Sequence, residues 1–129
     1  MGADVNVLAA WIGFLLAMLS GIIPGLLFRG EKWMGGYNSW ERRLTRLGHI
    51  SLFGLGFINL AFGLTMRSLG ISENLALPSF LFIVGAISMP IICYMSAWKP
   101  IIRHLFFIPV VSLLFATVLT LLRIWPILC

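Results

Sequence analysis

Four long apolar runs, each long enough to cross a bilayer, take up nearly all of this chain of 129 residues. A spanning helix needs about 20 mostly apolar residues, because each residue rises about 1.5 Å through a hydrocarbon core about 30 Å thick. The sequence places such spans at approximately residues 6–28, 44–66, 75–98 and 101–125. It therefore predicts an all-α integral membrane protein, with four transmembrane helices in an antiparallel bundle and a single membrane domain over residues 1–129.

The composition excludes a soluble domain. Apolar residues make up 60% of the chain and charged residues only 10%, whereas soluble domains carry about 25% charged residues. A net charge of +5 would suggest nucleic acid as a partner of a soluble protein, but here the basic residues cluster between the apolar runs. We therefore expect contacts with anionic lipid and no nucleic-acid partner.

Basic residues are distributed unequally between the two ends of the predicted bundle. One end holds only Arg67 and Arg123. The other end holds seven basic residues: Arg29, Lys32, Arg42, Arg43, Arg46, Lys99 and Arg103. Because Lys and Arg in short loops are retained in the cytoplasm during insertion, the end with seven is predicted to be cytoplasmic. Both termini are then non-cytoplasmic, and the distribution suits a bacterial inner membrane.

A few residues inside the spans carry specific expectations. Pro24 predicts a kink in the first span, because proline removes a backbone donor and clashes with the preceding turn. Asn59 lies deep in the second span, where an amide is expected to form a hydrogen bond across the bundle. Cys93 and Cys129 fall on different segments at different depths, so no disulfide is expected.

The only two histidines, His49 and His104, are predicted to share one depth near the cytoplasmic end of the second and fourth spans. Each lies about 5 to 8 Å inside its predicted helix start. An imidazole in hydrocarbon needs a partner, and ionisable residues inside a membrane are candidates for function. Neutral imidazole is an axial ligand of haem iron, and a four-helix bundle can hold a cofactor between facing helices. The pattern therefore predicts a haem b with His49 and His104 as its metal ligands.

Nearby residues favour a haem over a bare metal ion. Gly56 and Gly63 follow His49 at intervals of seven, which leaves one stripe of the helix smooth enough for a flat macrocycle. Arg46 and Arg103 are placed where haem propionates would reach the interface. The predicted spans contain no Asp or Glu, which zinc and di-iron centres often recruit. Glycines also let membrane helices pack closely without any cofactor, so the haem prediction depends mainly on the histidines and the glycines only support it.

Other roles for the histidines stay open. Each ring could reach lipid headgroups or a backbone carbonyl, as amphipathic side chains at an interface often do, and then no cofactor is bound. One histidine could instead ligate the magnesium of a chlorophyll-type pigment, or form a hydrogen bond to a quinone.

These features predict a small membrane subunit of an electron-transfer complex that holds a b-type haem, or a similar tetrapyrrole, near the cytoplasmic face. Its expected partners are other membrane subunits, lipid and a quinone. The alternative is a non-catalytic structural subunit that packs against partner helices and lipid. A transporter that uses the breaks at Pro24, Pro90 and Pro109 is weaker, because carriers usually place polar residues at the midplane. Common nucleotide-binding and zinc-hydrolase motifs are absent, so an enzyme acting as an isolated chain is not expected.

Overall fold

The computed structural model describes residues 2–27 and 30–129, and these residues form helices and connections without any strand. The four long helices are α1 (Ala3–Leu27), α2 (Trp40–Ser68), α3 (Ala76–Trp98) and α4 (Phe107–Leu128), and two short 3-10 helices are η1 (Trp33–Gly35) and η2 (Pro100–Phe106). Each of the four long helical segments is long and apolar enough to cross a membrane, with η2 and α4 together forming the fourth. The predicted all-α membrane fold with four transmembrane helices is confirmed.

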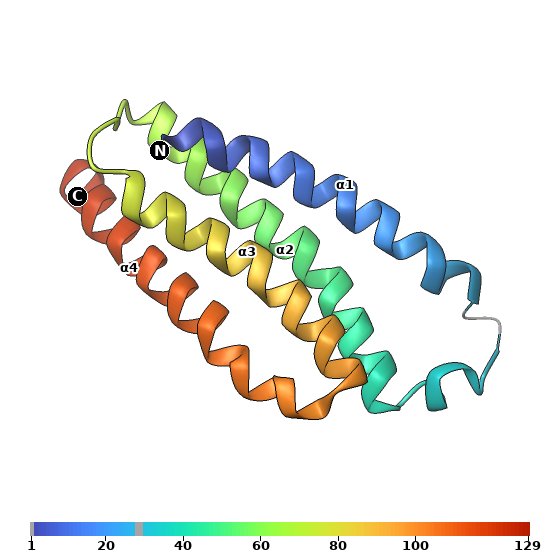
Figure 1. The fold of residues 1–129 in the computed structure, drawn as a ribbon. Coiled ribbons are helices and arrows are strands. Elements are labelled where there is room, and N and C mark those ends of the chain that lie inside the picture. The colour runs from blue at the N-terminus through green and yellow to red at the C-terminus, as the bar shows by residue number, and fades with distance from the viewer. Residues whose placement is uncertain (1, 28–29) are drawn as a thin grey trace.

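The helices are antiparallel and follow one another in chain order, with both termini at the same end (Figure 1). Each long helix packs against the next along the chain, and α1 also contacts α3. The central helices α2 and α3 are the most buried, while α1 and α4 expose most of their apolar residues.

Two helices begin earlier than predicted. α1 starts at Ala3 and α2 at Trp40, so Asp4 and Glu41 lie in first helical turns. Both helices therefore extend beyond the predicted spans, and each includes one acidic residue in its first turn. The physical reason is that a carboxylate complements the positive end of the helix dipole and is tolerated at a helix start. At α2 the Ser39 side chain also accepts a hydrogen bond of 3.2 Å from the backbone N–H of Arg42.

The fourth span also begins differently from the prediction. Lys99 has an extended backbone, as expected for a residue before proline, and the next seven residues form the 3-10 helix η2 instead of an α-helix. α4 itself begins only at Phe107. Pro24 lies in the last turn of α1, which ends at Leu27, so little helix follows the predicted kink.

A buried polar triad joins α1, α2 and α3. Its members, Asn6, Asn59 and Ser79, are all 0% exposed. Asn6 Nδ2 donates to Asn59 Oδ1 at 2.8 Å, and Ser79 Oγ donates to Asn6 Oδ1. Asn59 Nδ2 donates to the carbonyl of Leu55 at 2.9 Å, so its amide is satisfied. The predicted hydrogen bond of Asn59 across the bundle is confirmed, and its partner is Asn6.

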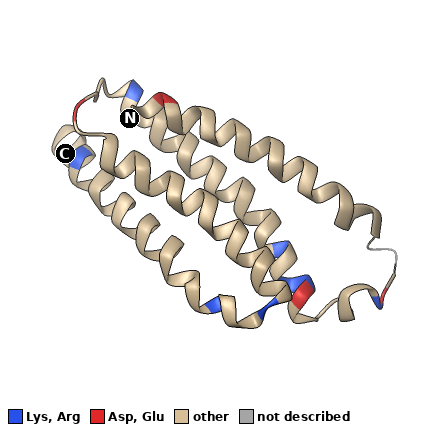
Figure 2. Ribbon diagram, viewed as in Figure 1, with Lys and Arg blue, Asp and Glu red and all other residues tan. Residues whose placement is uncertain are grey.

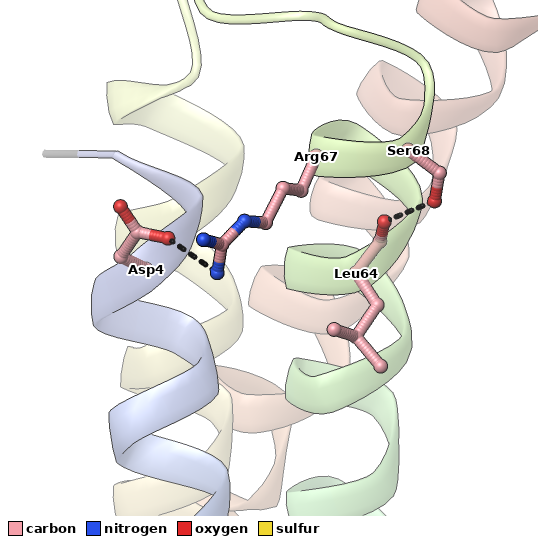
Figure 3. Close-up of polar contacts among 4 residues, drawn as sticks. All are labelled: Asp4, Leu64, Arg67 and Ser68. Carbon is pink, nitrogen blue, oxygen red and sulfur yellow. Dashed lines mark hydrogen bonds and ion pairs between the residues drawn. The ribbon is translucent and has the colours of Figure 1, made fainter.

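Lys and Arg lie near the ends of the helices (Figure 2). The basic end is the end that carries Lys32, Arg42, Arg43, Arg46, Lys99 and Arg103, while Arg29 lies outside the described residues. At the opposite end, Arg67 Nη1 lies 3.6 Å from Asp4 Oδ1 (Figure 3). The charges thus cluster where helices would leave a bilayer.

Candidate functional site

His49 faces α1. Its Nδ1 lies 3.0 Å from Ser20 Oγ, and its ring is half-buried. A Cβ added to Gly21 would lie only 2.8 Å from His49 Cε1, so the ring rests on α1 where glycine leaves room. Phe53 makes an edge contact with the ring, at 5.5 Å between centroids. The partner of His49 is therefore a serine hydroxyl on the neighbouring helix.

His104 lies in different surroundings. It is exposed on η2, which packs against α3 and α4. A 3-10 helix turns every 3.0 residues, so the His104 side chain points in a different direction from the one that an α-helix would give it. His49 contacts Ser20 and Phe53, and among the described residues no hydrogen bond or ring contact joins it to His104. Among the described residues, no three His, Cys, Asp or Glu are grouped so that they could hold a metal ion.

The arginines that were predicted to meet propionates have other surroundings. Arg46 Nη2 donates to the Tyr37 carbonyl at 3.1 Å, and its guanidinium lies 4.2 Å from the centroid of the Tyr37 ring. Arg46 therefore ties the connection between α1 and α2 to the first turns of α2. Arg103 is exposed on η2.

The glycine stripe is covered by α1. A Cβ at Gly56 would lie 2.7 Å from the ring of Phe14, and one at Gly63 would lie 2.8 Å from the carbonyl oxygen of Ala3. The space next to both glycines is thus filled by protein, as close helix packing requires. Gly56 and Gly63 serve the contact between α1 and α2 and offer no surface to a macrocycle in this arrangement.

A small pocket of about 120 Å³ lies beside His49. Its lining residues are Gly21, Pro24, Gly25, Thr45, Arg46 and His49. One water occupies about 30 Å³ in the liquid, so this pocket has room for a few waters and is much smaller than a tetrapyrrole. The residues around His49 do not fit a haem here, and the haem stays a prediction without geometric support.

A larger groove of about 650 Å³ lies at the basic end. The residues that line this groove are Ser20, Ile23, Pro24, Trp33, Met34, Thr45, Tyr94, Met95, Trp98, Lys99 and Ile102. They come from α1, η1, α2, α3 and η2, so five elements converge on it. The groove shares Pro24 and Thr45 with the small pocket. Ser20 lines the groove and His49 the small pocket, so the hydrogen bond between them connects the two spaces.

The groove combines aromatic rings with neutral hydroxyl groups. Trp33, Tyr94 and Trp98 supply the rings, and Lys99 is the one charged residue among the described residues that line it. The hydroxyl of Tyr94 is buried and has no hydrogen-bond partner among the described residues. Ser20 lies seven residues before the end of α1, which places it about 10 Å along the helix from that end. Lys99, in contrast, caps the end of α3. Among the described residues, the deep part of the groove, beside Ser20, is thus neutral, and the cation lies at the end of α3.

Ser20 and Tyr94 were not predicted as site residues from the sequence. Each lies within an apolar run with no polar residue directly beside it, and that position is the only sequence signal for it. The close approach of Tyr94 to α2 depends on Gly48, where a Cβ would lie 3.0 Å from the Tyr94 ring.

Comparisons with known proteins add no family to this description: no protein-family model matches the sequence, and neither a curated protein nor a solved structure gives a significant match.

Proposed function

We propose that this chain is a small membrane subunit of an electron-transfer complex that binds a lipid-soluble ligand of the quinone class in the groove at the basic end. The observation that carries this proposal is the lining of the groove, which joins three aromatic rings to neutral hydroxyl groups. A quinone has a flat ring, two uncharged oxygens and an apolar tail. Mostly apolar pockets with a few placed polar groups are the usual sites for such molecules.

The charge distribution in the groove argues against an anionic headgroup as its deep occupant. Ser20 and Tyr94 are neutral, and the cation of Lys99 is at the end of α3. An anion held among neutral hydroxyls would lose its hydration without gaining a counter-charge, which is costly in an apolar setting. An uncharged quinone oxygen has no such penalty.

The position of the groove also suits a ligand that arrives through the membrane. Trp33 and Trp98 lie near helix ends, where indole rings favour the headgroup level. Ile23 and Met95 are 63% and 51% exposed and extend the apolar lining toward lipid. A tail lying over these side chains would remain in hydrocarbon while the ring entered the groove.

We propose that the basic end of the bundle faces the cytoplasm of a bacterial cell and that both termini are on the outer side of the inner membrane. The excess of Lys and Arg at that end supports this orientation. The groove then faces the cytoplasmic leaflet, where a partner subunit could exchange electrons with the bound ligand.

A binding titration tests the proposal. A short-chain quinone is added to the detergent-purified protein, and quenching of tryptophan fluorescence is followed. We expect saturable quenching for the wild type and several-fold weaker binding for Tyr94→Phe, which loses the unpartnered hydroxyl. Met95→Trp, which fills the groove from an exposed position, should also weaken binding.

Tyr37→Phe is the matched control for this titration. Tyr37 is 70% exposed, lies outside the groove, and contacts Arg46 through its ring and carbonyl. This variant should bind as the wild type does. Quenching that rises linearly and equally in all four proteins would show partition into detergent and would contradict the proposal.

The two-histidine haem has a separate test. A b-type α band in the reduced-minus-oxidised spectrum that disappears in both His49→Ala and His104→Ala would establish haem ligation. A colourless protein from haem-replete cells would contradict it, and quinone binding would be unaffected by that result.

A structural subunit is the second candidate, and the surface of α4 favours it. Only Pro109, Ser112 and Ala116 are buried on this helix, so most of its apolar surface is free for lipid or partner helices. Native electrophoresis of solubilised membranes tests this role. A chain running at the size of a monomer in mild detergent would contradict it.

A further inference from the structure

Ser20 has two partners within the protein. Its Oγ lies 3.0 Å from the carbonyl oxygen of Ala17 and 3.0 Å from Nδ1 of His49. A serine hydroxyl carries a single proton and two acceptor lone pairs. The carbonyl of Ala17 can only accept, whereas the role of the imidazole nitrogen depends on its tautomer.

Both possible arrangements engage the single proton of Ser20. If Ser20 donates to Ala17, then the Nδ1–H of His49 donates to Ser20, and one lone pair of the hydroxyl remains. If Ser20 donates to His49 Nδ1, both lone pairs remain. In either case Ser20 offers the groove an acceptor, and it can donate to a ligand only by giving up an internal hydrogen bond.

Tyr94 has the opposite property. Its buried hydroxyl has no partner among the described residues, so its proton is available to a ligand oxygen that comes within hydrogen-bond distance. Both oxidised and reduced quinones carry oxygens that can accept such a bond. Because a quinone carbonyl is a stronger acceptor than a quinol hydroxyl, a bond from Tyr94 does not favour the reduced form.

We propose that the groove selects the reduced, hydroxyl-bearing form of its quinone ligand over the oxidised form, and that Ser20 is the residue that determines this selectivity. This inference rests on the proposed quinone-binding function. A quinol hydroxyl donates to the acceptor that Ser20 presents. An oxidised quinone has carbonyl oxygens only, and these leave that acceptor unmatched.

His49 is a positioning residue in this arrangement. Its Nδ1 holds Ser20 Oγ from the side of the small pocket, and its ring is held against α1 by the absence of a side chain at Gly21. Ser20 thereby contacts His49 and also lines the groove.

A competition experiment under argon tests the selectivity. The detergent-purified chain is loaded with equal amounts of a short-chain ubiquinone and its quinol, washed, and extracted, and both forms are measured by absorbance. We expect the wild type to retain about tenfold more quinol, because one matched hydrogen bond contributes about 1 to 1.5 kcal/mol. Ser20→Ala should bring the ratio close to one, and Ser20→Thr, which keeps a hydroxyl, should preserve it.

Tyr94→Phe separates selectivity from affinity. It should reduce the retained quinone at least as much as the retained quinol, so the ratio of quinol to quinone should not fall. A wild-type ratio near one, or one that favours the quinone, overturns the inference while the proposed function stands. If neither form is retained, both the inference and the proposed function fail. Should Ser20→Ala fail to fold, the wild-type ratio and that of Ser20→Thr still decide.

Discussion

Asn6 and Asn59 form a hydrogen bond of 2.8 Å between α1 and α2, and both side chains are completely buried. In Asn59→Ala, Asn6 Nδ2 keeps only its contact of 3.3 Å with the carbonyl of Ser79. Hydrogen bonds between membrane helices contribute about 0.6 kcal/mol on average and up to about 1.7. Because packing is lost as well, we expect the free energy of unfolding to fall by about 1 to 2 kcal/mol.

Titration of the purified protein from mild detergent into dodecyl sulfate measures this change. Thr117→Ala is the control, because Thr117 is exposed and its hydroxyl donates only to the carbonyl of Leu113 in its own helix. Equal stability of the two variants would show that the buried triad contributes nothing to the packing of α1.

The glycines of α2 give a second prediction. A Cβ at Gly63 would lie 2.8 Å from a backbone oxygen of α1, and one at Gly56 would lie 2.7 Å from the Phe14 ring. Both Gly56→Ala and Gly63→Ala should therefore destabilise the protein by about 1 to 3 kcal/mol, the usual cost of overpacking. A Cβ added to Gly54 would have nothing within 4 Å, so Gly54→Ala should be neutral in the same titration. A loss of stability in Gly54→Ala as large as in the other two would mean that helix flexibility, not contact with α1, is responsible.

The number and location of the long helices could be predicted from the sequence because the bilayer imposes one strong requirement on every span. Backbone groups in hydrocarbon must pair within the segment, so length and apolar composition alone locate the helices. The ends of the helices were less predictable. Glu41 could enter α2 and Lys99–Pro100 could start a 3-10 helix because caps, dipoles and proline act locally at the interface, where hydropathy gives no signal.

The candidate site was harder to predict than the helices, because a site depends on the direction in which side chains point around each helix. His49 and His104 were predicted to share a depth, but the sequence cannot show that one ring meets Ser20 while the other is exposed on η2. Asn59 was predictable as a hydrogen-bonding residue, since an amide in lipid needs some partner. Its particular partner, Asn6, follows only from the packing of α1 on α2.

Orientation in the membrane gives a third prediction, which concerns the two ends of the helix bundle. Cys129 is exposed and Cys93 is buried, and both are free cysteines. If both termini are outside the cytoplasm, a membrane-impermeant maleimide should label Cys129 in intact spheroplasts. Arg103→Cys in a Cys129→Ser background should be labelled only after the membrane is permeabilised. The reverse pattern would place the basic end outside.

The ion pair between Asp4 and Arg67 gives a fourth prediction (Figure 3). The two atoms lie 3.6 Å apart, and the side chains of Arg67 and Asp4 are 72% and 84% exposed. Ion pairs this exposed are screened by water and salt and contribute less than about 1 kcal/mol. Asp4→Asn should therefore change the unfolding midpoint much less than Asn59→Ala does, at low and at high salt. A loss similar to that of Asn59→Ala would show that this pair lies in a less polar setting than its exposure indicates.

The position of His49 gives the fifth prediction, which links packing to the groove. A Cβ at Gly21 would lie 2.8 Å from His49 Cε1, so Gly21→Ala must displace the ring and weaken its hydrogen bond to Ser20. In a His104→Ala background, where His49 is the one remaining histidine, diethylpyrocarbonate should modify Gly21→Ala several-fold faster than its parent. Gly25→Ala is the control, because Gly25 lines the same small pocket but has nothing within 4 Å of an added Cβ. Equal modification rates for all three proteins would mean that α1 does not hold the imidazole, and Ser20 would then lack the positioning that the selectivity for quinol requires.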